Sequence, residues 1–466
     1  MNTPMKARDF FDVRGRLNRM LTTDLFSYQE LRGMFFTLFL DQFFIRFIGV
    51  LSTAMVASTG EAAMAAVSMV GTVNGLVSLT FYSLATGGAI VIARAKGSGD
   101  AHRVRCAIGE TTGVCAALAL VLSTLLFAFA PLLVGVLYPH VEPLLYDYSV
   151  HYMRLMSISF VPYSIFNAIF NSFRSLGDTK SSLFLTIVIN GLHLVFCLLF
   201  INVLKMGVTG AGLSYITVRV IGMAVALLWI LKVNNHYGVH VRHFFRFSKK
   251  VSKQIISLGT PIAMESVLLQ GGMLLVQIYL AKLTTMEIAA YAVANSLITV
   301  YYIPGDTLVT LSGTVCGQCI GANRFDDARR YCRNFIRIGR VILLLTVMVL
   351  LPLSNPLMDL FSATEQARPI IMRCCVIAVA CLPLLWCDSY IVPMALRAAG
   401  DAVFTSVVSV VALLVCRCVV GYILTIPLGL GVPGVWISLV VEWLLRAVVL
   451  RLRLRGDRWE KCRDKQ

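Results

Sequence analysis

Charged residues are scarce in this sequence: they make up 14% of its 466 residues, whereas hydrophobic residues make up 58% and the mean hydropathy is +0.79. A soluble globule of this length needs polar side chains to cover its surface, and this composition does not supply them. The scarcity of charge therefore excludes a soluble fold. The first residues, MNTPMKARDFFDVRGRLNRM, also lack a cleavable apolar core, so we expect a cytoplasmic tail there rather than a signal peptide.

Patterns typical of metal sites and disulfide frameworks are also missing, although the chain has 13 cysteines and seven histidines. Most of the cysteines lie within apolar stretches, where we expect them to be small packing residues. Cys316 and Cys319 form a CxxC pair, but neither a second pair nor a His-x-x-x-His partner accompanies it. Clustered His and Asp residues or a nucleophile, which a membrane enzyme would need, are not found either. We therefore expect no metal, no cofactor and no enzymatic activity.

What the chain has in abundance is long apolar stretches. About 20 apolar residues cross the hydrocarbon core of a bilayer as a helix, and twelve stretches of this kind can be placed. The sequence therefore predicts an all-α integral membrane protein with twelve transmembrane helices. The predicted spans are 34–57, 63–92, 108–138, 148–172, 181–203, 208–232, 257–283, 288–315, 336–361, 369–394, 403–425 and 428–450.

The basic residues follow the membrane topology. The net charge of +17 arises from 41 Lys and Arg against 24 Asp and Glu. If the first span starts in the cytoplasm, nearly all of these bases fall on the cytoplasmic side, as the positive-inside rule requires. The excess is therefore topological, and we expect no nucleic-acid partner. The exceptions are Lys205, Lys282, Arg368 and Arg373 on the opposite side, and Arg46, Arg154, Arg219 and Arg417 within spans.

The chain repeats itself. A shift of 224 residues places Asp41 on Glu265, and the phrases RSLGD and RAAGD match at a shift of 223. Each half thus has six helices. Because six is even, both halves enter the membrane from the same side, and the pseudo-two-fold axis that relates them lies along the membrane normal. The expected organisation is a cytoplasmic segment at 1–33, an N-lobe at 34–232, a cytoplasmic linker at 233–256, a C-lobe at 257–450 and a basic cytoplasmic tail at 451–466.

The repeated phrase reads Arg-x-x-Gly-Asp and follows the fourth helix of each half. Glycine permits the backbone to reverse, and Asp178 or Asp401 can cap the helix that follows. We interpret each phrase as a tight cytoplasmic turn rather than as a substrate site.

Three carboxylates lie within predicted spans at positions that stand out. Charged groups are costly in lipid and tend to face a cavity or a partner. Asp41 and Glu265 occupy equivalent positions in the first and seventh spans, and Asp306 lies in the eighth. We expect Asp41 and Glu265 to bind substrate or a coupling ion. The alternative is that each pairs with a basic group such as Arg46 or Arg417.

Several stretches together resemble the multidrug and toxic compound extrusion (MATE) transporters. They are SLATGGAIVIARAKGSGD, GQCIGANRFDDAR, RSLGDTK, and RAAGDAVFTSVVSVVALLVCRCVVGYI with GLGVPGVWISLVVEW. The resemblance covers nearly the whole chain. It implies twelve helices, two lobes around a central cavity, and export of organic, often cationic, compounds in exchange for H+ or Na+. The alternative is a lipid-linked oligosaccharide flippase, which belongs to the same superfamily.

The N-lobe departs from the family pattern. Ser52 stands where many relatives carry an aspartate that binds the coupling ion. Asn190 matches the family's asparagine in the fifth span, but Leu194 stands where the next aspartate is expected. His193 lies beside it, either as an imidazole that replaces the lost carboxylate or as a packing residue. The candidate Na+ ligands are Asp41 and Asn190.

In the C-lobe, Asp388 lies near the place of the acidic residue that relatives carry in the tenth span. Arg417 matches the family's arginine in the eleventh span, and we expect it to pair with Glu265 or Asp388. With Asp306, these residues complete the candidate site.

These features lead us to expect a secondary active multidrug efflux antiporter that works by alternating access. The expected partners are a small-molecule xenobiotic, cationic or amphipathic, and the lipid bilayer, with H+ or Na+ as the coupling ion. We expect a monomer in the cell membrane with both termini in the cytoplasm.

The topology makes a direct prediction. Single-cysteine labelling with a membrane-impermeant reagent should find residues 242–253 and 324–340 in the cytoplasm, because both segments are rich in bases. Labelling of either segment from the exterior would contradict the parallel repeat.

Overall fold

The computed structural model describes residues 13–56, 61–139, 142–360 and 364–465, and these residues form helices joined by short turns, without a strand. Within the described residues, each predicted span overlaps one helix or a run of helical pieces, and a turn at residues 351–353 interrupts the ninth span. Within the described part of the chain, nine helical segments are long and apolar enough to cross a membrane. The protein is therefore a multi-pass membrane protein, as the sequence predicted.

The helices divide into two successive sets, preceded by the short helix α2 (Val13–Leu21). The first set comprises α3 (Tyr28–Val56), α4 (Glu61–Gly97), α5 (Ala101–Ala128), α6 (Ala130–Leu137), α7 (Pro143–Ser175), α8 (Thr179–Cys197) and α9 (Gly207–Leu228). The second comprises α10 (Lys249–Leu280), α11 (Thr285–Gly321), α12 (Phe325–Leu350), α13 (Ser354–Leu360), α14 (Arg368–Cys381), α15 (Cys387–Ala398), α16 (Ala402–Ala412), α17 (Gly421–Thr425) and α18 (Val432–Arg455).

Four π-helical pieces extend or join these helices. In the first set, α8 continues into Leu198–Val203 and α9 into Trp229–Val233. In the second set, Leu382–Trp386 joins α14 to α15, and Leu413–Val420 joins α16 to α17. Such turns are often found at functional sites, and the last of them carries Arg417.

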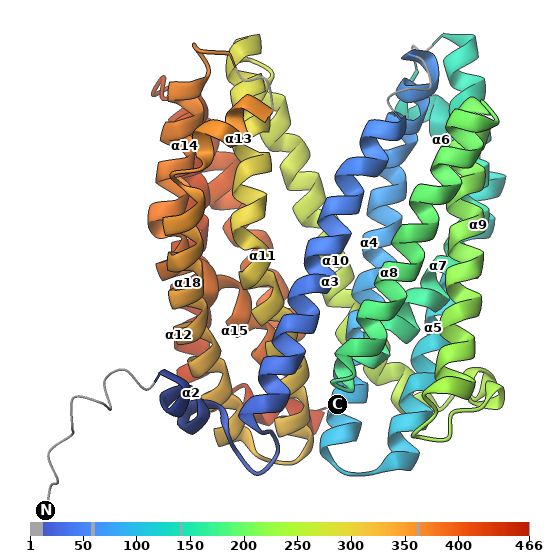
Figure 1. Cartoon of the computed structure of the whole chain (residues 1–466), viewed down its shortest axis with the longest axis vertical. Coiled ribbons are helices and arrows are strands. Elements are labelled where there is room, and N and C mark those ends of the chain that lie inside the picture. Colours follow the sequence, from blue (N-terminus) through green and yellow to red (C-terminus); the bar gives the residue numbers. More distant parts are fainter. Residues whose placement is uncertain (1–12, 57–60, 140–141, 361–363, 466) are drawn as a thin grey trace, which may run out of the picture.

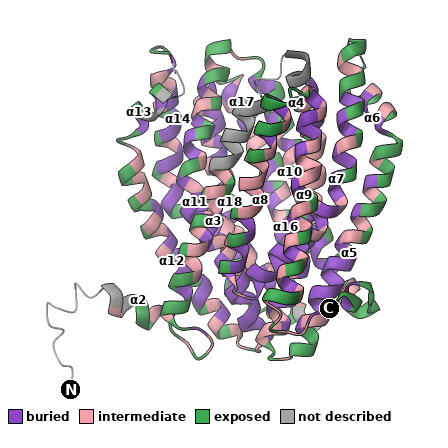
Figure 2. Cartoon of the chain, turned by 45° about the vertical axis from the view of Figure 1, so that its right-hand side comes forward, coloured by how far each residue is buried: buried purple, intermediate pink, exposed green. Residues whose placement is uncertain are grey.

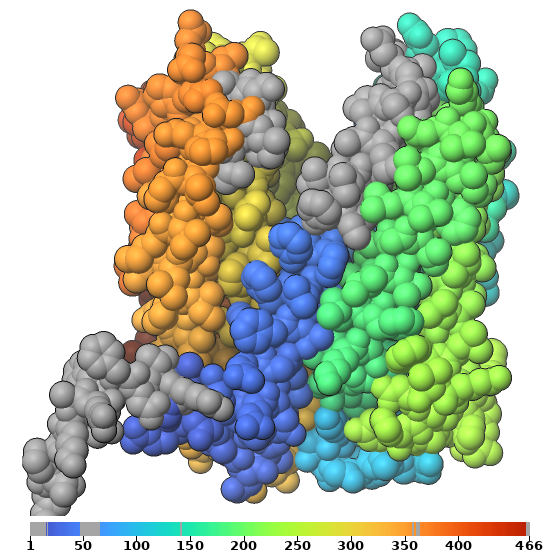
Figure 3. Space-filling view, in the orientation of Figure 1, coloured from blue at the N-terminus to red at the C-terminus, as the bar shows by residue number. Residues whose placement is uncertain are grey.

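The two sets form two halves that stand side by side (Figure 1). The blue-to-green half lies on the right and the yellow-to-red half on the left, and the helices converge at the lower end. We call this the closed end; α2 and the carboxyl end of α18 also lie there (Figure 1). Toward the opposite end the halves part, and Figure 3 shows a hollow between them.

The burial of side chains also differs between the two ends of the molecule. Buried residues concentrate toward the closed end, where the helices of both halves pack (Figure 2). One buried cluster joins Leu84 and Ile92 of α4 to Ile255 and Leu258 of α10, so the apolar core crosses from one half to the other. Large apolar side chains on the outer faces remain exposed, which suits a surface that contacts lipid.

Glycines allow the halves to touch at the closed end. A Cβ on Gly97 of α4 would collide with the backbone of Gln318 in α11, and one on Gly321 of α11 would collide with the backbone of Arg94 in α4. Gly97 and Gly321 are related by the sequence repeat. The seam between α4 and α11 is therefore a symmetric close approach of two backbones, which small residues permit.

Hydrogen bonds across this seam obey the same symmetry. Gln318 donates through its side-chain amide to the carbonyl oxygen of Ser175 at 2.9 Å. Arg94 donates through Nε to the carbonyl oxygen of Ala398 at 2.7 Å. Both acceptors lie in the Arg-x-x-Gly-Asp phrases, one residue after each arginine. Each of the two turns thus accepts a hydrogen bond from the opposite half.

Because α4 and α11 approach closely at Gly97, a larger side chain at this position should destabilise the protein. Gly97→Val should lower the apparent melting temperature of the purified protein, because overpacking costs about 1 to 3 kcal/mol and the colliding atoms belong to the backbone of α11. Gly75→Val is the matched control on the same helix, since a Cβ at Gly75 meets no atom within 4 Å. Equal melting temperatures for the two variants would show that the seam is looser than described.

Candidate functional site

Asp41 is the buried centre of the first half. It lies on α3, and its side chain is fully shielded from solvent. One carboxylate oxygen accepts a hydrogen bond from the guanidinium of Arg174, at the end of α7, and the other accepts one from the hydroxyl of Thr186 on α8. The Arg174 guanidinium also lies over the ring of Phe170, 4.1 Å from its centroid. The carboxylate thus joins three helices.

Glu265 has the same surroundings in the second half. It lies on α10, where Arg397 Nη2 donates to its Oε2 at 2.5 Å and Ser406 Oγ donates to the same oxygen at 2.8 Å. Arg174 and Arg397 are the first residues of the two repeated phrases. In each half, the arginine of the repeated phrase therefore binds the buried carboxylate of the same half. The two ion pairs occupy equivalent positions in the repeat.

The interpretation of the phrases as turns is right but incomplete. Gly177 and Gly400 have φ values of +75° and +100°, which a residue with a Cβ rarely adopts. Asp178 caps α8 by accepting from the backbone N–H of Ser181 at 3.2 Å. Asp401 makes no such cap with its side chain; it binds Arg453 at 2.7 Å instead. The role of the two arginines was not predicted from the sequence.

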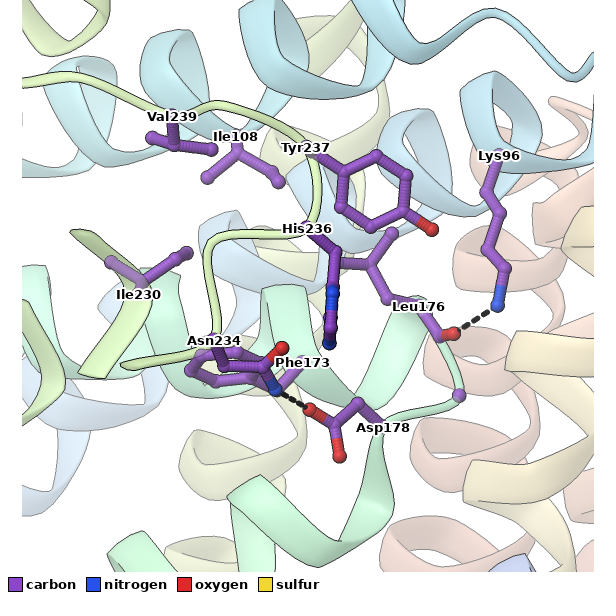
Figure 4. Close-up of a pocket in the computed structure, with 11 residues that line it drawn as sticks. Lys96, Ile108, Phe173, Leu176, Asp178, Ile230, Asn234, His236, Tyr237 and Val239 are labelled. Atoms are coloured by element: carbon purple, nitrogen blue, oxygen red, sulfur yellow. Dashed lines mark hydrogen bonds between the residues drawn. The ribbon is translucent and has the colours of Figure 1, made fainter. Parts of the chain in front are cut away.

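The turn of the first half is anchored further by the linker. Asn234 donates to the carboxylate of Asp178, and Lys96 donates to the carbonyl oxygen of Leu176 (Figure 4). These residues line a pocket of about 390 Å³ at the closed end, into which His236 and Tyr237 of the linker also project (Figure 4). The linker therefore packs against the turn and helps to fix it.

The alternative considered for Asp41 and Glu265, pairing with a basic group, is observed, but the basic groups are not the ones named from the sequence. Asp41 does not pair with Arg46, because Arg46 of α3 binds Asp306 of α11 in an ion pair that joins the two halves. Arg417 pairs neither with Glu265 nor with Asp388. Its partner is Glu442 of α18, with Nε and Oε2 2.8 Å apart, a carboxylate that the sequence analysis did not single out.

Asp388 belongs to a different environment. It accepts from Arg340 of α12 at 2.7 Å and from Arg451 of α18. These residues line a pocket of about 370 Å³ with four further arginines, at the closed end of the second half. The further arginines are Arg329, Arg333, Arg337 and Arg455. The structure does not bring Asp388 together with Glu265.

Two of the residues predicted for the N-lobe site, Asn190 and His193, line a cavity of about 390 Å³ inside the first half. Asn190 donates to the carbonyl oxygen of Thr186 at 2.8 Å, and the hydroxyl of Thr186 donates to Asp41, which does not itself line the cavity. His193 packs against Tyr215, with ring centroids 4.6 Å apart. Ser52 lies on α3 outside the residues whose side chains the structure describes. Na+ binding at Asp41 and Asn190 stays a prediction.

A smaller pocket, of about 60 Å³, lies between the halves and is lined by residues of α4, α7, α11 and α15. Tyr82 and Arg174 line both this pocket and the cavity of the first half. The arginine that holds Asp41 therefore stands where the cavity meets the interface. Among the described residues, no three His, Cys, Asp or Glu side chains gather in a group that could hold a metal ion.

Comparison with known proteins agrees with this architecture. The MatE family model matches the chain twice, at residues 38–199 and 261–423, once in each half. The uncharacterized transporter YisQ of Bacillus subtilis is 24% identical over 433 residues, which cover 91% of this chain and 93% of the relative. The probable multidrug resistance protein NorM of Thermotoga maritima is 22% identical over 89% of each chain.

A solved structure has the same fold. It is described as the outward-facing conformation of a multidrug resistance MATE family transporter of the MOP superfamily, and it superposes with a TM-score of 0.81 over 91% of this chain and 95% of that chain, at 18% identity. Because the family model matches both halves, the chain belongs to the MatE family, the multidrug and toxic compound extrusion transporters.

Proposed function

We propose that this protein is a secondary active antiporter that exports amphipathic organic compounds in exchange for a cation by alternating access. It would act as a monomer in the cell membrane with both termini in the cytoplasm, and it needs no cofactor besides the coupling ion. The observation that carries the proposal is the chain of contacts from Asp41 through Arg174 to Thr314, because it links a buried carboxylate of one half to the other half.

The chain of contacts has two steps. Asp41 holds the guanidinium of Arg174. The carbonyl oxygen of the same Arg174 accepts a hydrogen bond from the hydroxyl of Thr314 on α11, at 2.9 Å. A change at the carboxylate therefore acts on a residue that is bonded to the opposite half at the closed end.

Protonation of Asp41 is the change that we propose. The Arg174 guanidinium already neutralises this carboxylate, so a Na+ ion bound beside it would be repelled by Arg174 unless the arginine moved away. A proton on Asp41 removes the charge that holds Arg174 and leaves a buried guanidinium without its counter-ion, which is strongly unfavourable. The closed end would then open more readily, and this difference between the two states is what couples ion movement to transport.

The second half offers an equivalent centre. Glu265 and Arg397 repeat the pair, and Ala398, the next residue, accepts the hydrogen bond from Arg94 of the first half. The ion pair between Arg46 and Asp306 is a further contact across the interface. Opening of the closed end therefore requires contacts supplied by both halves to break.

The expectation of cationic substrates needs a restriction. It came from the resemblance to the MATE transporters, but Asp41, Glu265, Asp306 and Asp388 are all bonded to arginines in the structure. A large organic cation would have to compete with an arginine for each of these carboxylates. We therefore propose amphipathic compounds as substrates. The charge that a substrate carries would be determined by the residues that line the cavity.

Removing the titratable charge tests the proposed coupling. Asp41→Asn and Glu265→Gln should each lower gradient-driven efflux at least tenfold, because neither amide can exchange a proton. Efflux is measured in inverted vesicles under a pH gradient and, separately, under a sodium gradient, with fluorescent amphipathic dyes of both charges. Asp147→Asn, which changes an exposed carboxylate on α7, is the control and should keep the native rate.

Loss of folding would imitate loss of coupling, since breaking a buried ion pair costs about 3 to 5 kcal/mol. Dye binding to each purified variant separates the two. If both neutral variants export at the native rate, the carboxylates are structural pairs and the proposed coupling is wrong. Sodium-driven efflux without proton-driven efflux would instead reject the proton as the ion.

A further inference from the structure

Arg219 of α9 is a buried cation without a carboxylate partner in the described part of the chain. Its side chain is 6% exposed. Nη1 donates to Ser159 Oγ at 2.6 Å, and the guanidinium carbon lies 4.3 Å from the ring centroid of Tyr163 and 5.3 Å from that of Tyr215. The guanidinium carbon also lies 5.6 Å from the ring centroid of Phe160. A hydroxyl and three aromatic rings thus offset part of the charge, but no carboxylate of the described residues pairs with it.

The other buried arginines of the spans are compensated differently. Arg174 binds Asp41. In the second half, Glu442 lies between Arg417 and Arg446, with distances of 2.8 Å and 3.4 Å to their guanidinium nitrogens. Arg219 therefore differs from these three in lacking an acid.

The sequence repeat shows that the first half lacks an equivalent of Glu442. GVTGAGLSYITVR in α9 aligns with GVPGVWISLVVEW in α18 through two glycines and a serine, and this alignment places Val218 on Glu442. Val218 is buried and lines the cavity of the first half beside Arg219. At the position where the second half supplies its own carboxylate, the first half has an apolar side chain.

The cavity around Arg219 suits an organic anion. Its lining includes Arg174 and Arg219 but no Asp or Glu, and Arg174 is already paired with Asp41. The Nε2 atom of His193 is buried and has no hydrogen-bond partner among the described residues. Phe166, Phe170 and the two tyrosines supply aromatic walls. A volume of about 390 Å³ is within the range of small-molecule sites.

The electrostatics favour one sign of charge. An uncompensated guanidinium in a membrane span is unfavourable, so a ligand that brings a negative charge gains the energy of a charge-assisted hydrogen bond without removing an existing partner. A cation entering the same cavity meets a like charge in a medium of low dielectric constant, where repulsion is strong. The aromatic walls then bind the apolar part of either ligand equally well.

The geometry points to an anion site: Arg219 binds the acidic group of amphipathic aromatic acids, and the rings around it hold the apolar part. The inference rests on the proposed function in one respect, that such compounds are the exported substrates. Binding itself does not depend on it, which allows the two to be tested apart.

The test is equilibrium binding of two dyes that share a xanthene core, fluorescein as the anion and rhodamine 6G as the cation. Full-length protein is held in nanodiscs of phosphatidylcholine, so that no anionic lipid competes, and binding is followed by fluorescence anisotropy. Fluorescein should bind at least tenfold more tightly than rhodamine 6G. Arg219→Gln should weaken fluorescein binding at least tenfold, whereas Arg219→Lys, which keeps the charge, should retain most of it.

Val218→Glu is the sharper variant, because it supplies the acid at the place that Glu442 occupies in the second half. It should abolish the preference for fluorescein while leaving rhodamine 6G binding intact or stronger, which also shows that the cavity has folded. Arg154→Gln, at an exposed arginine of α7, is the matched control and should change neither dye.

The outcomes separate the inference from the proposed function. Tighter binding of rhodamine 6G, or fluorescein binding that responds to neither Arg219→Gln nor Val218→Glu, overturns the anion site. Fluorescein binding that depends on Arg219, in a protein that exports neither dye under either gradient, supports the anion site and rejects the antiporter. Competition by phosphatidylglycerol added to the nanodiscs would confirm the anion site and identify a lipid as a further occupant.

Discussion

The neutralisation of charge inside the membrane is the constraint on which this structure depends. A carboxylate or guanidinium in a transmembrane span is tolerated when a partner meets it there. Asp41 and Glu265 are met by Arg174 and Arg397, which stand at the ends of α7 and α15. Each pair ties the first helix of its half to the turn after the fourth span, and each turn in turn bonds to the opposite half. The repeated phrase is thus a unit in which arginine, glycine and aspartate have separate tasks.

The symmetry of the closed end is carried by backbone groups more than by side chains. The donors are a glutamine in one half and an arginine in the other, Gln318 and Arg94, yet both acceptors are carbonyl oxygens one residue after the paired arginines. A carbonyl acceptor is present whatever the side chain, so two halves with different sequences keep the same contact. Glycine at 97 and 321 is needed for the same reason, because the approaching surfaces are backbone.

The spans, the repeat and the turns could be predicted from the sequence because each depends on residues close together in the chain. Hydrophobic length marked the helices, and Gly177 and Gly400 marked the turns. The charge partners could not be predicted in this way, because Arg417 and Glu442 lie on different helices and several carboxylates were available to each arginine. One signal was present but unused: Asp41 with Arg174 and Glu265 with Arg397 repeat at nearly the same shift, and a spacing kept in both halves indicates a contact.

The two halves share a fold but differ in how their buried arginines are paired with carboxylates. This difference suits the proposed exchange of two solutes. In the second half, Glu442 lies between Arg417 and Arg446, so each of these two arginines has a carboxylate partner within the protein. In the first half, Asp41 satisfies Arg174, while Arg219 faces a cavity with Val218 where the acid would stand. The proposed coupling ion binds to Asp41, which is already paired with Arg174. The proposed cargo binds to Arg219, which has no carboxylate partner among the described residues. Arg174 lines the cavity as well as holding Asp41, so under this proposal an anion bound at Arg219 would lie near the guanidinium that protonation would release, and electrostatics within one half would couple the two events.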